Sequence, residues 1–448
     1  MDPVLLARIQ FAATVGFHFI FPPISIGMAW LIAWMMTRWV RTGEDLHRDM
    51  ARFWIRIFGA TFAMGVATGI TMEFQFGTNW ATYSRYVGDI FGAPLAAEAI
   101  FSFFLESSFL AVLLLGWGRL SRRALWFASI MVAFGATLSA FWILAANSWQ
   151  QTPAGYHVVN GRAELTSFSA AILNPSTIPR FLHTFIAAII TGSFFMMSLS
   201  AVILLRRPGS ILARRSMILA LFVALVSGIL QVPLGHLHAI EVVENQPVKL
   251  AAFEAHFRTE APAYQTLLGI PDEDAMTVHY AVRIPMMLSF LAYGDFHSEV
   301  RGLEEFPRDD WPPVALTFLS FRLMILMAGV FILLPLWGGY LWWKRRSFQN
   351  RWFLWATILS LPLPTLCNEL GWITAEVGRQ PWAVWHLLRT KDAVSSVVSA
   401  NEIAVSLAGF SVLYLVLFIL WIVVLVHLVR RRIVDETAAP ASESEVAS

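Results

Sequence analysis

Three side chains that can bind metal ions lie inside apolar stretches of this sequence. His18, His183 and Met324 occur in GFHFIFPP, RFLHTFIAAIITG and SFRLMILMAG. Imidazole and thioether groups are axial ligands of haem iron, and imidazole also binds other transition metals. A helical methionine is more often a core residue than a ligand. No one of these residues indicates a ligand site by itself, but the three taken together indicate a haem or metal site.

Carboxylates occupy similar apolar surroundings. Glu98 and Glu106 lie in APLAAEAIFSFFLESSF, and Glu376 precedes Arg379 in GWITAEVGRQPW. A charged side chain at the centre of a bilayer costs at least about 2.5 kcal/mol, so each acid is a functional candidate. The spacing of Glu98 and Glu106 corresponds to about 12 Å along a helix and suggests a proton relay. A structural pair that bonds to hydroxyl groups is the alternative.

The elements that position these side chains are expected to be membrane-spanning helices. The chain has 448 residues, of which 57% are hydrophobic and only 14% are charged. This usage lies far from that of a soluble globular protein. The net charge of +2 is close to zero, and the arginines fall in short clusters rather than on one basic face, so nothing here indicates nucleic-acid binding. The single Cys367 excludes an intrachain disulfide.

Nine segments are long and apolar enough to cross about 30 Å of hydrocarbon. Each should be a helix because an open sheet cannot satisfy its backbone in lipid. The sequence therefore predicts an all-α integral membrane protein with a bundle of nine transmembrane helices. The predicted spans are 11–37, 53–77, 94–117, 124–146, 180–205, 216–234, 314–343, 352–373 and 403–429.

Arginine and lysine indicate the orientation of the bundle, because short cytoplasmic loops are enriched in both. Basic residues follow every odd-numbered span, whereas the connection 78–93 holds only Arg85. The N-terminus is therefore predicted outside and the C-terminus in the cytoplasm. In this orientation the three ligand candidates and Glu376 lie toward the outer half of the membrane. The basic residues are Arg38, Arg41, Arg48, Arg52, Arg56, Arg119, Arg122, Arg123, Arg206, Arg207, Arg214, Arg215, Lys344, Arg345, Arg346, Arg351, Arg430, Arg431 and Arg432.

The chain divides into four predicted parts. Residues 1–234 form a six-helix membrane part, and 314–432 form a three-helix membrane part. Between them, 235–313 is a polar outer segment too long for a simple connector. The tail 433–448 is small, polar and acidic, and we expect it to be disordered.

The residues alone leave several functions open. Two histidines, a methionine and Glu376 at one depth suit haem, although a metal site without haem is also compatible. In a non-redox transporter or proton channel, the acids would form the permeation path and the histidines would only pack. A haem-copper oxidase core would need several more intramembrane histidines, so it is rejected.

Six motifs, in order along nearly the whole chain, resemble subunit I of the cytochrome bd-type quinol oxidases. They are HFIFPPISIG (18–27), FGAPLAAEAIFSFFLES (91–107), FLHT (181–184), ENQPVKLAAFE (244–254), SFRLM (320–324) and GRQPW (378–382). The outer segment lacks the long insertion of some members. In this family the outer segment is called the Q loop, and the chain resembles the type with a short Q loop. Whether it belongs to the cyanide-insensitive branch stays open.

The resemblance implies a set of ligands and cofactors. His183 and Met324 match the axial ligands of a low-spin haem b. His18 and Glu376 match the ligands of two high-spin haems, one haem b and one haem d, or haem b in place of haem d. Which of the two residues binds which high-spin haem stays open.

Further roles are implied in the same way. Glu98 and Glu106 match carboxylates that pass protons to the oxygen site, and Lys249 and Glu254 match residues of quinol oxidation. Four residues match or adjoin the haem surroundings, and they are Arg322, Trp372, Arg379 and Asn147.

The implied function is that of a terminal respiratory oxidase. Quinol would be oxidised at the outer face and O2 reduced to water with cytoplasmic protons, which generates a proton motive force without pumping. The implied partners are subunit II of the same oxidase, membrane lipid and quinol, with a small single-helix accessory subunit left open and nucleic acid excluded. The implied location is the bacterial cytoplasmic (inner) membrane.

Overall fold

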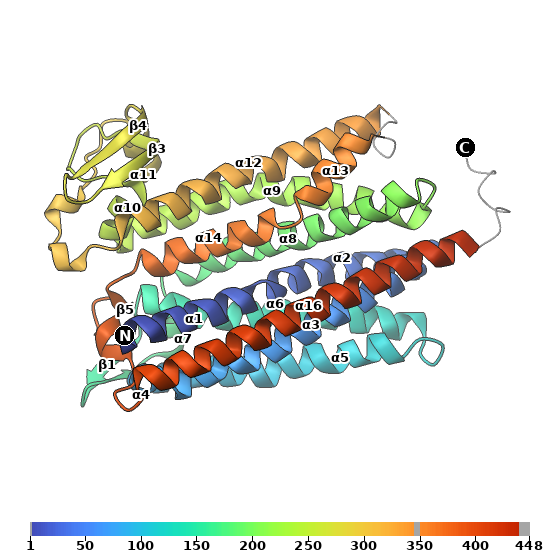
Figure 1. Ribbon diagram of the computed structural model, residues 1–448, viewed down its shortest axis with the longest axis horizontal. Helices are drawn as coiled ribbons and strands as arrows, with labels where there is room; N and C mark the ends of the chain where they lie inside the picture. Colours follow the sequence, from blue (N-terminus) through green and yellow to red (C-terminus); the bar gives the residue numbers. More distant parts are fainter. Residues whose placement is uncertain (1, 345–349, 439–448) are drawn as a thin grey trace.

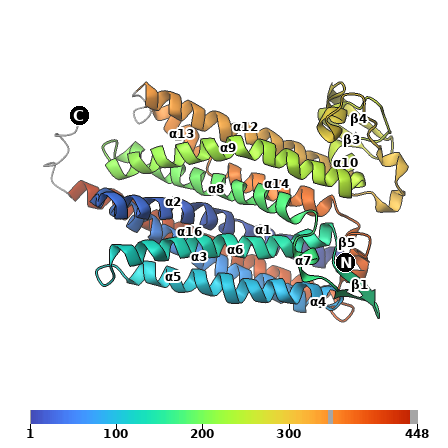
Figure 2. The ribbon, with the colours of Figure 1, turned by 180° about the vertical axis from the view of Figure 1, so that it is seen from behind.

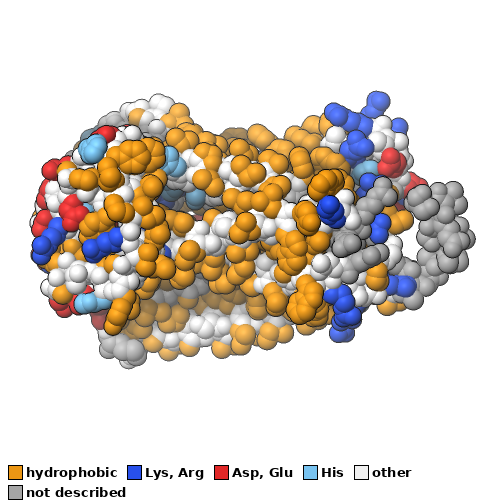
Figure 3. Space-filling view, turned by 90° about the horizontal axis from the view of Figure 1, so that it is seen from above, with side chains coloured by type: hydrophobic (Ala, Val, Ile, Leu, Met, Phe, Trp, Pro, Cys, Tyr) orange, Lys and Arg blue, Asp and Glu red, His pale blue; other side chains and the backbone are white. Residues whose placement is uncertain are grey.

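Eight long apolar helical stretches run side by side along the molecule (Figure 1). The computed structural model describes residues 2–344 and 350–438. A broad belt of hydrophobic side chains covers the middle of the surface and separates two charged ends (Figure 3). Within the described residues, the stretches able to cross a membrane are Pro3–Thr42, Asp45–Gly77, Ala81–Leu115, Arg122–Gln151, Thr177–Arg206, Ile211–Asn245, Val314–Trp343 and Ala400–Asp435.

Two of these stretches are not regular α-helices throughout. The first consists of α1 (Pro3–Phe19) and α2 (Phe21–Thr42), and two prolines open α2, where a missing N–H costs no hydrogen bond. The third consists of α4 (Ala81–Ala97), the π-helix η1 (Glu98–Phe103) and α5 (Phe104–Leu115). Helix α4 thus occupies most of 78–93, which was predicted to be a loop.

The remaining long helices are continuous. They are α3 (Asp45–Gly77), α6 (Arg122–Gln151), α8 (Thr177–Arg206), α9 (Ile211–Asn245), α12 (Val314–Trp343) and α16 (Ala400–Ala438). Helix α16 extends into the segment 433–448 that was predicted to be disordered, and the predicted tail from 439 lies outside the described residues. Arg345 and Arg346, used for the orientation, also lie outside them.

The predicted span 352–373 is divided. Helices α13 (Arg351–Leu359) and α14 (Leu363–Val377) are separated at residues 360–362, and Pro362 and Pro364 flank the start of α14. Proline removes a backbone donor and clashes with the preceding turn, which interrupts the helix. Neither piece alone is long enough to span a bilayer.

The outer segment 235–313 is structured rather than a loop. Its first part continues α9 as far as Asn245, and α10 (Pro247–Glu254) follows at once. It then holds the antiparallel strands β3 (Gln265–Asp272) and β4 (Thr277–Ile284) and the short helix α11 (Met287–Tyr293).

Smaller elements lie at the same end of the bundle (Figure 2). They are the hairpin of β1 (Tyr156–Val159) and β2 (Arg162–Leu165), α7 (Phe168–Ile172), η2 (Leu303–Glu305), η3 (Arg308–Asp310), the pair β5 (Trp382–Val384) and β6 (Leu388–Arg389), and α15 (Thr390–Ala393).

One close helix crossing depends on glycine. A Cβ added to Gly27 of α2 would stand 2.3 Å from the Ala188 carbonyl oxygen and 2.8 Å from the Gly192 nitrogen of α8. No larger residue fits at that separation. The contact holds α2 directly against α8, the helix that carries His183.

Candidate functional site

The two inward-stepping carboxylates both face α6. Ser139 donates a hydrogen bond of 2.7 Å to Glu98, and a Cβ on Gly135 would stand 3.1 Å from the Glu106 Cβ. Gly135 and Ser139 are four residues apart and share one face of α6. The structure therefore brings Glu98 and Glu106 against one helix.

The π-helix explains this alignment. In a regular α-helix, eight residues turn the side chain about 80° away from its starting direction. A π-helical turn takes in an extra residue through i→i+5 bonding, which returns Glu106 toward the side of Glu98. The segment Glu98–Phe103 is that π-helix.

Sequence reasoning missed a third acid in this region. Glu73 of α3 lies within electrostatic range of Glu98. The sequence pattern that could have identified Glu73 is the one that identified Glu98, namely an acid inside an apolar helical stretch.

His18 has a defined ring partner. Its Nδ1 lies 2.9 Å from the Thr68 hydroxyl oxygen, and that hydroxyl donates to the Met64 carbonyl at 2.8 Å. Since the hydroxyl proton is used on Met64, the hydroxyl accepts from Nδ1–H of His18. This tautomer leaves the Nε2 lone pair of His18 for a metal.

His183 lies between α8 and α9. The Gln231 amide donates to the His183 carbonyl at 3.1 Å, and the ring centroid of His238 is 5.6 Å from that of His183. His238 turns inward, with its side chain 20% exposed and its Nε2 3.9 Å from Glu241.

Each of the three nitrogen and sulfur ligand candidates faces a glycine on a neighbouring helix. A Cβ on Gly69 would stand 3.3 Å from His18 Cε1, and one on Gly235 would stand 3.3 Å from His183 Cε1. A Cβ on Gly371 would stand 3.0 Å from the Met324 sulfur. Side chains at these positions would crowd the ligand atoms, so each glycine leaves room for the ligand side chain against the neighbouring helix.

The donor set also bears on the kind of metal site. Among the described residues, no three His, Cys, Asp or Glu side chains come together as a metal-binding group. A haem iron needs only one or two protein ligands because the porphyrin supplies the other four. The residues present therefore fit a haem, which needs few protein ligands.

Glu376 is embedded in hydrogen bonds. It pairs with Arg379, and it accepts from Asn147 at 3.0 Å and from Gln151 at 3.3 Å. Arg379 also donates to Gln150. The structure thus brings together Glu376, Arg379 and Asn147, three of the predicted site residues. Trp372 is half-buried on α14 and makes no hydrogen bond or ring contact within the described part of the chain.

Lys249 reaches this group from the outer segment. Its ammonium donates to Gln151 at 2.9 Å and to Gln246 at 3.2 Å. Gln151 in turn donates to Glu376 at 3.3 Å, so a hydrogen-bonded path runs from Lys249 through Gln151 to Glu376. Burial, reinforced by Arg180, lowers the pKa of Lys249 to about 7. Gln151 was not predicted, because an amide at the end of a helix carries no distinctive sequence signal.

Glu254 and Arg322 form a buried ion pair that joins α10 to α12. Their side chains are 4% and 5% exposed. Burial raises the pKa of Glu254, and the Arg322 guanidinium opposes that rise. The Arg322 Nε is buried without a partner, which leaves one donor for a further anion. The sequence predicted both residues but not their pairing.

The fold and site together define a class: a helical multi-pass membrane protein whose interior holds acids, histidines and cations. The model of the cytochrome bd terminal oxidase subunit I family matches residues 6–433, and the chain belongs to that family. It is a subunit of a terminal quinol oxidase, a quinol:O2 oxidoreductase, and a multi-pass bacterial membrane protein. Family membership implies haem and quinol and excludes a non-redox transporter or channel.

Relatives agree over nearly the whole length. The chain is 40% identical over 428 residues to cytochrome bd ubiquinol oxidase subunit 1 of Bacillus subtilis (strain 168), which covers 93% of this chain and 91% of the relative. It is 38% identical to cytochrome bd-II ubiquinol oxidase subunit 1 of Escherichia coli (strain K12), with 92% and 93% covered. A chain of the bd oxidase structure from Geobacillus thermodenitrificans matches with a TM-score of 0.89 and 31% identity, covering 96% and 99%.

Proposed function

We propose that this subunit holds three haems. His183 and Met324 would hold a low-spin haem b, and His18 and Glu376 would hold a high-spin haem b and a haem d, or haem b in its place. Bound there, the haems would supply one-electron transfer and the reduction of O2. The glycines that face the ligand atoms and the tautomer of His18 support this arrangement.

The outer segment is the proposed site of quinol oxidation. Glu254 accepts a proton and Lys249 donates a hydrogen bond to the substrate oxygen. Arg322 neutralises Glu254 after deprotonation. Because this segment extends from one end of the bundle (Figure 1), protons released there would leave at that end, which is the outer face in the proposed orientation.

Protons for oxygen reduction are proposed to come from the cytoplasm through Glu106 and Glu98. The alignment of the two acids along α6 supports this route. Charge separation then needs no pump, because protons are released and consumed on opposite sides.

Nine crossings are proposed, with the N-terminus outside and the C-terminus cytoplasmic in the bacterial inner membrane. The N-terminus and the end of α16 lie at opposite ends of the bundle, which favours an odd number of crossings (Figure 1). Helices α13 and α14 together would supply the ninth. The division into 1–234, 235–313, 314–432 and 433–448 stands as a proposal, with helix continuing across 234.

The proposed partners are subunit II of the oxidase, membrane lipid and quinol. A single-helix accessory subunit is a further proposed partner, and no nucleic acid is expected. The relatives are named subunit 1, which supports a complex of several chains. Exposed apolar residues on α16, such as Val405, Val412 and Leu415, give a surface for lipid or another subunit.

The observation that carries the proposal is the path from Lys249 through Gln151 to Glu376, which joins the proposed substrate segment to a proposed ligand. The test is a reduced-minus-oxidised visible spectrum of the purified complex, with pyridine haemochrome analysis to separate haem d from haem b. We expect bands of a low-spin haem b and of high-spin haems. A colourless, folded complex would refute the proposal.

The pKa of Lys249 predicts a pH dependence. Below about pH 7 its ammonium is protonated and donates, and above that pH the donor charge is lost, so kcat/KM for quinol should fall as pH rises through 7. Arginine stays protonated across this range, so Lys249→Arg should remove the fall. The measurement is a pH profile from about pH 5 to pH 9. The same alkaline limb in both proteins would contradict the assignment.

A further inference from the structure

Arg180 is a buried cation to which neither the motifs nor the proposed function assign a role. It lies on α8, three residues before His183, and is 4% exposed. Its Nη1 donates to the Asn147 side-chain oxygen at 3.3 Å. Its Nε and Nη2 are buried without any hydrogen-bond partner.

The two unpartnered nitrogens are the side-on edge of the guanidinium. That edge presents two parallel N–H donors whose spacing matches the two oxygens of a carboxylate. A buried guanidinium with two unused donors is costly, because both have lost water without gaining an acceptor. The geometry therefore calls for an anion with two oxygens.

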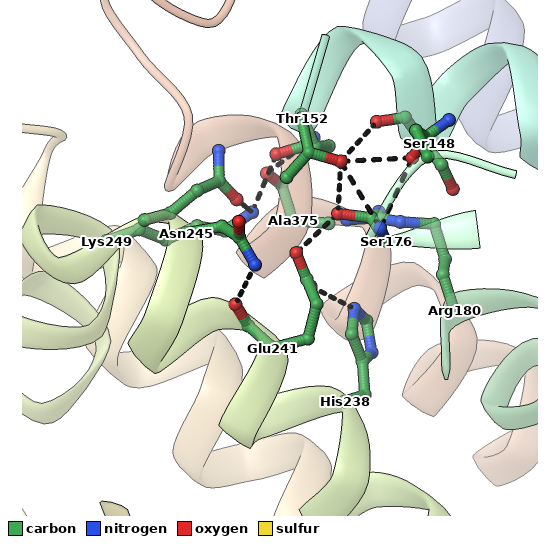
Figure 4. Close-up of polar contacts among 12 residues, drawn as sticks. Ser148, Thr152, Ser176, Arg180, His238, Glu241, Asn245, Lys249 and Ala375 are labelled. Carbon is green, nitrogen blue, oxygen red and sulfur yellow. Dashed lines mark hydrogen bonds and ion pairs between the residues drawn. The ribbon is translucent and has the colours of Figure 1, made fainter. Parts of the chain in front are cut away.

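The acids near Arg180 do not supply it. Glu241 accepts from Ser176 at 2.5 Å through one oxygen (Figure 4). Its other oxygen is buried without a hydrogen-bond partner, 3.9 Å from His238, and forms no ion pair with Arg180. Glu376 is paired with Arg379 and bonded by Asn147 and Gln151. Among the described residues, no carboxylate forms an ion pair with Arg180, so its Nε and Nη2 donors are available to an anion from outside the chain.

The position on α8 indicates which anion. Residues three apart on a helix lie on the same face, about 4.5 Å apart along the axis. Arg180 therefore lies on the His183 side of α8, one turn closer to the outer end. We propose that its Nε and Nη2 edge binds a propionate carboxylate of the haem held by His183, an inference that rests on the proposed function.

Such a contact would affect the redox equilibrium. A fixed cation next to a haem favours the ferrous form, because reduction removes one positive charge from the iron. Loss of the guanidinium should therefore lower the midpoint potential of the low-spin haem. We expect Arg180→Gln to change the ferric-to-ferrous ratio at a fixed potential about tenfold, a downward shift of about 60 mV.

The test is a redox titration of the purified complex followed at the low-spin haem band, with haem content measured by pyridine haemochrome. Arg180→Lys keeps the charge but replaces the two-donor edge with a single donor head, so its shift should be downward and smaller. The matched control is Arg162→Gln, which removes an exposed cation from β2 at the same end of the molecule and should leave the potential unchanged.

The outcomes separate the two proposals. A potential within error of the unaltered protein in every Arg180 variant recovered, with full haem content, would overturn the propionate contact alone. If Arg180→Gln does not fold, Arg180→Lys decides by the same criterion. Absence of a low-spin haem band from the unaltered complex would instead overturn the proposed function.

Discussion

Replacement of His183 by Ala is expected to remove the low-spin haem b band and to lower quinol oxidase activity at least about a hundredfold. The imidazole lies between α8 and α9 with Gly235 against its Cε1 atom. His183 is the only histidine within Thr177–Arg206. Met324→Ala should give the same spectral loss, because it removes the other proposed axial ligand. The measurements are the reduced-minus-oxidised spectrum and oxygen consumption with quinol.

His157→Ala is the matched control. It removes an exposed histidine from β1 at the same end of the molecule and should leave both spectrum and activity unchanged. Should correctly inserted His183→Ala and Met324→Ala proteins keep the full absorbance, the ligand assignment would be lost.

Replacement of Glu254 by Gln is expected to lower the quinol oxidation rate about a hundredfold or more, because it removes the proposed proton acceptor. The same change leaves the buried Arg322 without its counter-charge. Breaking a buried pair from one side costs about 3 kcal/mol, so the Tm in detergent should also fall. The predicted readouts are quinol oxidation kinetics and a thermal unfolding curve.

A double variant separates the two effects. Glu254→Gln combined with Arg322→Met removes both charges, so it should regain much of the stability without regaining activity. Glu305→Gln breaks the exposed pair with Arg301 and should change stability by less than about 1 kcal/mol. Full quinol oxidation by a stable double variant would show that the pair is only structural.

The membrane architecture was largely predictable from the sequence. Apolar runs of about 20 residues have few alternatives to a helix in lipid, so eight of the nine predicted spans correspond to helices in the described residues. The predicted helix boundaries were least accurate where prolines interrupt a helix and where a polar segment folds into short elements. Prolines divide the span 352–373, and the outer segment 235–313 folds into helices and strands that its polarity did not indicate.

Residue types by themselves determined which side chains could bind iron or carry protons, because an ionisable or ligating group inside an apolar helix is costly wherever that helix packs. Tertiary structure alone decided their partners. The pairing of Glu254 with Arg322, the path through Gln151 and the unused edge of Arg180 depend on helices distant in sequence. Hydrogen bonds act over about 3 Å and need defined angles, so only the packed helices select which of many compatible donors and acceptors meet.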